Sequence, residues 1–241
     1  MRIKSLVTSV AGLALFVQAG TAIAQSKPTV AVLPFTNSAI GKANEELAPL
    51  SKGLADLMTS ALAANPGIRV VERDRIQAVM EEQKLSSAGA VDAATAVKVG
   101  KIIGAHHMIT GVFITEKSGA MKLVTRVFNV ETSEIVSGGG AEETGNTSAI
   151  MVLVDKLAAK QNKNLKLPDI PAAAREEHAA AAKKQEKVPF QAVMLYSRAL
   201  DEKDHGNKDK AVTLFKQSLQ AFPDYDQPKK ELEKLGVKAG N

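Results

Sequence analysis

Two adjacent histidines, His106 and His107, are the first candidates for chemistry in this sequence. Imidazole nitrogen is a common zinc ligand, so a histidine pair raises the question of a metal site. These two residues enter a predicted strand, where neighbouring side chains point to opposite faces. No cysteine and no further histidine lies at ligand spacing, because His178 and His205 fall in predicted polar helices. We therefore favour a structural or solvent-exposed role for the pair and predict neither a metal nor a cofactor.

The other patterns that resemble catalytic or phosphate-binding sites each lack a necessary part. Glu81 and Glu82 are paired carboxylates, but neighbours one apart on a helix do not face each other. The Gly138–Gly140 run is not followed by a lysine and a helix start, and Gly41-Lys42 lacks the upstream glycine of a nucleotide-binding loop. There is no G-x-S-x-G element to present a nucleophilic serine. The sequence thus predicts no catalytic residue and a protein that is not an enzyme.

Charged residues at the end of a predicted strand form a candidate surface for protein contact. Arg73 lies between Glu72 and Asp74, directly after the apolar run that ends at Val71. A simpler interpretation is local, since Asp74 and Gln77 have the spacing of a capping box at the start of the next helix. Arg73 is kept as a candidate partner residue beside this alternative.

Short apolar runs and helical stripes alternate through the first two thirds of the chain. Thr29–Phe35 is apolar without alternation, the pattern of a strand covered on both faces. Asp92 can cap a helix whose inward residues are small, which indicates close packing on a sheet. The other predicted strands are Ile68–Val71, His107–Ile114, Met121–Val130 and Glu134–Ser137. The last three should form an antiparallel meander. Further helices are predicted over Leu50–Leu62, after Asp74 and over Ser148–Leu157, with loops at 36–46 and 85–91. These elements predict an α/β fold with a mixed sheet and flanking helices.

The first 24 residues have the three parts of a secretory signal peptide. Arg2 and Lys4 form a basic start, Leu6–Val17 an apolar core, and the segment ending at Ala24 a small-residue cleavage site. The apolar run is shorter than the roughly 20 residues that span a bilayer, and no later run reaches that length. We expect cleavage between Ala24 and Gln25, export to the periplasm of a Gram-negative cell, and no transmembrane segment in the mature chain.

The net charge of +5 at pH 7 does not by itself indicate a nucleic-acid-binding protein. The lysines are spread along the chain among acidic residues, and no aromatic residues are interleaved with them for base stacking. We expect proteins of the envelope as partners, and no nucleic acid.

The composition changes after about residue 162, and a helical repeat follows. Residues 163–188 are rich in alanine, lysine and glutamate, which predicts a solvated linker or helix. Residues 189–237 contain the spacing of one tetratricopeptide-like repeat, a small all-α helical hairpin. The pattern is carried by Leu195, Ala199, Gly206, Ala211, Phe215, Ser218 and Pro223. Because the first helix of such a repeat commonly lines a binding groove, Tyr196 and Lys203 are candidate partner residues. Packing of Tyr196 within the repeat is the alternative.

Three segments together resemble the curli production assembly and transport family, named for the curli secretion channel CsgG. They are Val30–Phe35, Leu50–Leu62 and Val70–Gly111. The resemblance implies a CsgG/TolB-N-terminal-like α/β domain over residues 27–162. Channel-forming members carry a lipidated cysteine and long membrane-inserting hairpins, whereas this chain has no cysteine and short predicted connections. The resemblance therefore implies the periplasmic scaffold of the family without its pore.

From these features we expect a non-enzymatic accessory protein of assembly or secretion in the periplasm, with a helical repeat for protein–protein interaction. A homo-oligomer is a further expectation. The same scaffold is shared with lipoprotein activators of peptidoglycan synthases. The alternative function is therefore a regulator or activator of a peptidoglycan or polysaccharide synthase.

Overall fold

The computed structural model describes residues 27–38, 42–85 and 91–238. The predicted signal peptide, including the expected cleavage site at Ala24 and Gln25, lies outside the described residues. So do residues 86–90 of the predicted loop at 85–91. The cleavage site and that loop therefore stay predictions.

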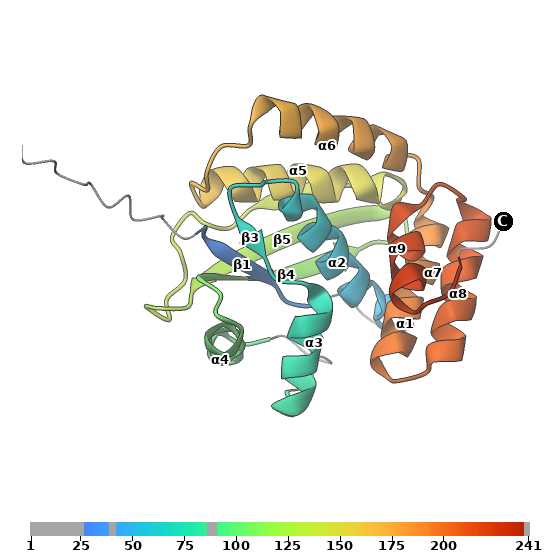
Figure 1. The fold of residues 1–241 in the computed structure, drawn as a ribbon, viewed down its shortest axis with the longest axis horizontal. Coiled ribbons are helices and arrows are strands. Elements are labelled where there is room, and N and C mark those ends of the chain that lie inside the picture. Colours follow the sequence, from blue (N-terminus) through green and yellow to red (C-terminus); the bar gives the residue numbers. More distant parts are fainter. Residues whose placement is uncertain (1–26, 39–41, 86–90, 239–241) are drawn as a thin grey trace, which may run out of the picture.

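The described strands form one mixed sheet in the order β3-β1-β4-β5-β6, with β2 paired to β4 (Figure 1). Their bounds are β1 Thr29–Val32, β2 Thr36–Asn37, β3 Arg69–Val70, β4 His107–Thr115, β5 Ala120–Asn129 and β6 Glu142–Asn146. Strand β1 runs parallel to both β3 and β4, and β2 is also parallel to β4. Strands β4, β5 and β6 are antiparallel neighbours. The predicted mixed α/β sheet is confirmed.

Helices cover both faces of this sheet. Helices α2 (Leu50–Ala63) and α5 (Ile150–Asn164) lie over one face, and α3 (Arg73–Glu82) and α4 (Ala93–Ile103) lie over the other (Figure 1). Val30 and Val32 of β1 pack into the core beside α2 and α5. Ala31 and the following residue, Leu33, pack into the core beside α3 and α4. This two-sided burial is the reason that the run is apolar at every position.

The third strand of the meander lies later in the chain than predicted. Residues Glu134–Ser137 make only an isolated bridge, between Phe128 and Ile135, and β6 supplies the third strand instead. The sequence of β6, EETGN, lacks the β-branched and aromatic residues that favour strands, so its pairing with β5 decides its conformation. The prediction of a loop over 36–46 is also partly wrong. This segment includes β2 and most of the short helix α1 (Lys42–Leu47).

One predicted helix cap is confirmed and another is wrong. The Thr95 amide donates to Asp92 Oδ1 at 2.7 Å, which caps α4 as expected. Helix α3 begins at Arg73, so Asp74 lies inside the first turn and cannot cap it. Glu72 takes the N-cap position without a side-chain hydrogen bond. The side chain of Asp74 pairs with Arg73 and Lys203 instead.

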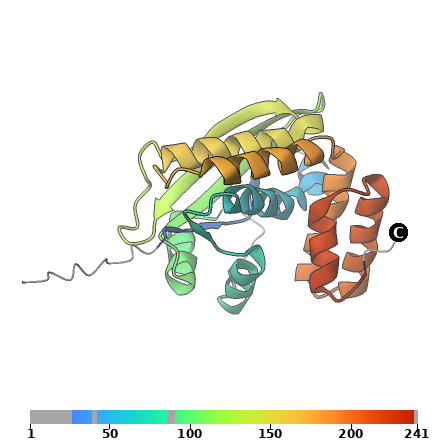
Figure 2. The ribbon, with the colours of Figure 1, turned by 45° about the horizontal axis from the view of Figure 1, so that its top comes forward.

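Four helices make up the C-terminal part of the chain. They are α6 (Ala172–Gln185), α7 (Phe190–Asp204), α8 (Lys208–Ala221) and α9 (Asp226–Lys234). Helix α6 lies along α5, while α7 and α8 form a hairpin at the end of the sheet beside α2 (Figures 1 and 2). The helical hairpin is confirmed. Its assignment as a tetratricopeptide repeat, and the boundaries at 27–162, 163–188 and 189–237, stay predictions.

A glycine lets α7 lie close to α2. A Cβ atom added to Gly53 would stand 1.9 Å from Ser197 Oγ and 2.9 Å from Ser197 Cβ. No side chain larger than hydrogen fits at that crossing without displacing α7. Gly53 therefore determines how closely α7 approaches α2.

A second close contact, between Gly111 on β4 and the buried Phe35 ring, gives a test of the sheet core. A Cβ at Gly111 would lie 2.3 Å from two ring carbons of Phe35, so Gly111→Ala should lower the free energy of unfolding by about 1–3 kcal/mol through overpacking. Urea denaturation measures this loss. Phe35→Leu removes the ring. The double variant should therefore lose less stability than the sum of the losses in the two single variants. Strict additivity would contradict the contact.

Candidate functional site

The three residues predicted as a partner surface meet at the junction between the α/β domain and the helical hairpin. Arg73 is the first residue of α3, and Tyr196 and Lys203 lie on α7. Arg73 is 4% exposed and Tyr196 is 1% exposed. The prediction that Arg73 and Tyr196 form a partner surface is therefore corrected to a buried junction. The alternative, that Tyr196 packs internally, describes the structure.

Asp204, at the end of α7, is the anion that joins the two parts. Arg73 Nη1 donates to both of its carboxylate oxygens, at 3.0 and 2.9 Å. Lys52 Nζ, from α2, lies 2.9 Å from Asp204 Oδ2 and 2.8 Å from Asp201 Oδ1. Arg73 and Lys52 are both buried, so each needs this counter-charge. Asp204 thus ties α7 to α2 and α3 at once.

Lys203 extends the ionic contacts to α9. Its Nζ lies 2.8 Å from Asp74 Oδ2 and also binds Glu231. Lys234, at the end of α9, pairs with Glu231 at 2.8 Å. Burial would raise the pKa of Asp74, but the hydrogen bond from Lys203 and the nearby cations outweigh it, so the pKa lies below 3.8. The Lys203 ammonium is therefore paired with carboxylates of the same chain.

Asp56 on α2 has the opposite electrostatic environment. The Tyr196 hydroxyl donates to Asp56 Oδ2 at 2.6 Å, and Arg73 Nε lies 4.0 Å from Oδ1. Burial raises the pKa of Asp56 above 3.8, and Tyr196 and Arg73 offset this only in part. Burial and the Asp56 carboxylate raise the pKa of Tyr196 well above 10.0, which keeps its hydroxyl a donor. The ring of Tyr196 also packs on Phe215 and Tyr225, at centroid distances of 5.7 and 5.5 Å.

The adjacent histidines have separate structural surroundings. His106 Nδ1 accepts a hydrogen bond from the Thr29 amide at 3.0 Å. His107 is half-buried at the start of β4, and burial lowers its pKa. Within the described ranges, no group of three or more His, Cys, Asp or Glu side chains is placed to hold a metal ion.

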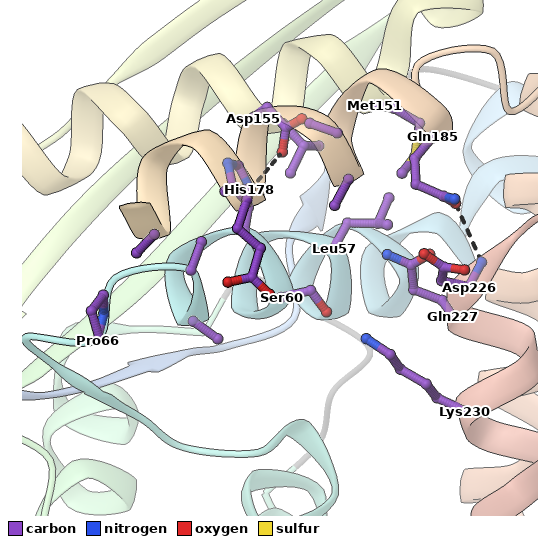
Figure 3. Close-up of a pocket in the computed structure, with 18 residues that line it drawn as sticks. Leu57, Ser60, Pro66, Met151, Asp155, His178, Gln185, Asp226, Gln227 and Lys230 are labelled. Atoms are coloured by element: carbon purple, nitrogen blue, oxygen red, sulfur yellow. Dashed lines mark hydrogen bonds and ion pairs between the residues drawn. The ribbon is translucent and has the colours of Figure 1, made fainter. Parts of the chain in front are cut away.

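A pocket of about 450 Å³ lies beneath α6 (Figure 3). Helices α2 and α5 supply an apolar floor that includes Leu57, Ala61, Met151 and Val154. Polar residues lie around it. They are Ser60, Asp155, Glu177, His178, Gln185, Asp226, Gln227 and Lys230. This pocket can hold a ligand with an apolar body and a polar or charged group.

The sequence reasoning missed this pocket. Its roof comes from Ala174, His178, Ala181, Ala182 and Gln185, which recur at helical spacing along α6. That stripe is a signal of an inward face, but alanine is uninformative because it suits both packed and solvated helices. The floor and the far end come from helices distant in sequence, which no local pattern connects.

The fold and these sites define a mixed-sheet α/β domain closed at one end by a helical hairpin. Residues 12–117 match the family model described as curli production assembly/transport component CsgG. The predicted resemblance to the CsgG family is therefore confirmed over this stretch. No curated protein matches the sequence.

Several solved structures are similar to the chain at low sequence identity. The LpoB C-terminal domain from Salmonella enterica is 17% identical, with a TM-score of 0.37 over 50% of this chain and 84% of that chain. A lipoprotein from Neisseria meningitidis is 13% identical, with a TM-score of 0.40 over 56% of this chain and 96% of that chain. The PelC dodecamer from Paraburkholderia phytofirmans is 11% identical, with a TM-score of 0.36 over 60% and 90%. These scores mark a distant likeness. No helix in the described part of the chain has the length and apolar character needed to cross a membrane.

Removal of the Asp204 charge should destabilise the junction strongly. Asp204→Asn leaves Arg73 and Lys52 with fewer counter-charges, so we expect the free energy of unfolding to fall by about 3 kcal/mol. Asp209→Asn, on the exposed first turn of α8, is the matched control and should cost less than about 1 kcal/mol. Equal losses in the two variants, measured by urea denaturation, would show that Asp204 does not hold the junction.

Asp56 and Asp74 should give opposite dependences of stability on pH. The raised pKa of Asp56 means that the folded state holds this proton more tightly, so its stabilisation is lost as the pH rises above 3.8. The lowered pKa of Asp74 contributes stability above 3.8 that is lost as the pH falls through the folded value. Relative to the wild type, Asp56→Asn should therefore gain stability as the pH rises, and Asp74→Asn should lose it. Urea denaturation across this pH range measures both differences. A common trend would refute the assignment.

Proposed function

We propose that this chain is a non-enzymatic accessory protein of assembly or secretion in the cell envelope, and that it acts in the periplasm. The observation that carries the proposal is the match of residues 12–117 to a family described as an assembly and transport component. The N-terminal sequence pattern of an exported protein supports the location.

The connection between the two longest strands supports a role beside a transport machinery rather than as its channel. Strand β4 ends at Thr115 and β5 begins at Ala120, so only residues 116–119 join them. These residues close a tight turn, in which the Gly119 amide donates to the Glu116 carbonyl at 2.9 Å. The connection is too short to supply the long hairpins of the channel-forming members.

Partner contact would use the exposed surface, because the junction residues are committed inside the molecule. The large apolar residues that remain exposed are Ile102, Ile114 and Ile135, at 45%, 44% and 58%. Singly exposed apolar side chains are common on protein surfaces, so these positions serve as exposed sites for a probe. A photo-crosslinking amino acid at Ile114 or Ile135 would therefore report envelope partners and self-association without disturbing the core.

The accessory role predicts a defect at the cell surface when the gene is deleted. The source strain should then display less of an exported surface protein or polysaccharide, measured by quantitative analysis of the surface fraction. The full chain should restore it, whereas a chain without residues 1–24 should not, because it stays in the cytoplasm. An unchanged surface, or restoration by the unexported chain, would contradict the proposal.

A polymerisation assay separates the accessory role from the alternative role as a synthase regulator. The purified mature protein is added to a peptidoglycan or polysaccharide synthase. An accessory protein of transport leaves the polymerisation rate unchanged. A change in rate would favour the regulator.

A further inference from the structure

The pocket under α6 exists because its roof is built from side chains too small to fill it. Helix α6 presents Ala174, Ala181 and Ala182 to the floor, and Gln185 is its only buried residue within the described structure. An aliphatic side chain in place of these alanines would pack on α2 and α5 as ordinary core. The helix therefore covers an apolar floor without occupying it.

Polar contacts fix the C-terminal end of the roof, and one longer polar approach lies near its middle. At the C-terminal end, Gln185 Nε2 donates to the Asp224 carbonyl at 2.8 Å, and its Oε1 accepts from the Asp226 amide at 3.3 Å. Near the middle of α6, His178 Nε2 stands 3.8 Å from Asp155 Oδ1, which is longer than a hydrogen bond (Figure 3). The pocket is thus a covered space whose roof is attached at its C-terminal end.

The lining holds one buried acceptor without a donor and three carboxylates with few cationic partners among the described residues. Gln227 Oε1 is buried and has no hydrogen-bond partner among the described residues. Asp226 and Glu177 make no side-chain ion pair with the described residues, and Asp155 has only the distant His178. Of these groups only Gln227 Oε1 is fully buried, while Asp155 and Asp226 are partly buried and Glu177 is exposed. A buried acceptor without a donor is costly, so a ligand that brings a donor to Gln227 and a positive charge to the partly buried carboxylates would be stabilised here.

The charge of the lining selects the sign of the ligand. Three carboxylates face the pocket, against Lys230 near Asp226 and Gln227 at the α9 end (Figure 3). At the Asp155 end no lysine or arginine lines the space. Burial raises the pKa of Asp155, and His178 offsets this only in part, so a nearby cation would favour the ionised form. Nucleic acids and acidic glycans would be repelled, and a neutral sugar could donate hydrogen bonds but would bring no positive charge to the carboxylates.

We propose that this pocket binds a peptide segment that places a lysine or arginine side chain against Asp155 and Glu177 and aliphatic neighbours on the floor formed by Leu57, Ala61 and Met151. The cation supplies the donors that the carboxylates lack. The aliphatic neighbours cover the apolar floor that the alanines of α6 leave open. This inference stands independently of the proposed accessory role, and most of the pocket lies outside residues 12–117.

The test uses the full mature chain and a fluorescein-labelled peptide, acetyl-Gly-Leu-Lys-Leu-Ala-Gly, with fluorescence anisotropy as the readout. A peptide with norleucine in place of lysine keeps the apolar body and removes the charge. We expect saturable binding of the lysine peptide and about tenfold weaker binding of the norleucine peptide. Binding of both that differs by less than twofold, or no saturation of the lysine peptide at about 1 mM, would overturn the proposal.

Variants locate the binding to the pocket. Asp155→Asn should weaken the lysine peptide about tenfold and leave the norleucine peptide unchanged, whereas Ala181→Phe fills the space and should abolish both. Glu176→Gln, an exposed acid on α6 that does not line the pocket, is the matched control and should bind as the wild type does. Thermal unfolding of each variant verifies the fold. Unchanged binding in Asp155→Asn, equal weakening in Glu176→Gln, or tighter binding of an oligogalacturonate than of the lysine peptide would overturn the proposal.

Discussion

Asp204 is the constraint on which the arrangement of this protein depends. It sits at the end of α7, where both of its carboxylate oxygens accept from Arg73 Nη1 and one pairs with Lys52. These are two buried cations on different helices of the α/β domain. Charges removed from water need partners, and ionic geometry tolerates little displacement. These contacts favour the observed seating of the hairpin on the domain, with Gly53 allowing the close crossing and Lys203 extending the contacts to α9.

The junction also decides where function can reside. Tyr196 and Lys203 on α7 and Arg73 at the start of α3 are the residues predicted to contact a partner, yet each makes a polar contact inside the molecule. The proposed contacts lie elsewhere, at exposed isoleucines and in the space under α6. Among the described residues, the Arg73 Nε and the Tyr225 hydroxyl at this junction are buried without a hydrogen-bond partner, and burial keeps both from reaching a partner protein.

The match to the CsgG family and most of the pocket lie in different stretches of the chain. The match to the CsgG family covers residues 12–117, which include β1 to β4 and helices α1 to α4. The pocket takes its roof from α6 and much of its lining from α5 and α9. A feature that depends on these later helices cannot be inferred from the family domain alone. The same division separates the role proposed from the family match from the peptide site proposed from the pocket.

The sequence by itself determined the classes of element and the two-layer cover of the sheet. Periodicity is a local property, so the all-apolar run of β1, the stripe of α2 and the cap at Asp92 were all readable, as was the family. Strand β6 was not, because a polar edge strand has no pattern of its own and forms only where β5 offers a partner. The prediction that Asp74 caps α3 was wrong, because Lys203, 129 residues along the chain, binds the Asp74 carboxylate. The tertiary structure alone decided that Arg73 and Tyr196 are buried and that Asp155, His178 and Gln227 share a pocket, since those facts depend on contacts between helices far apart in sequence.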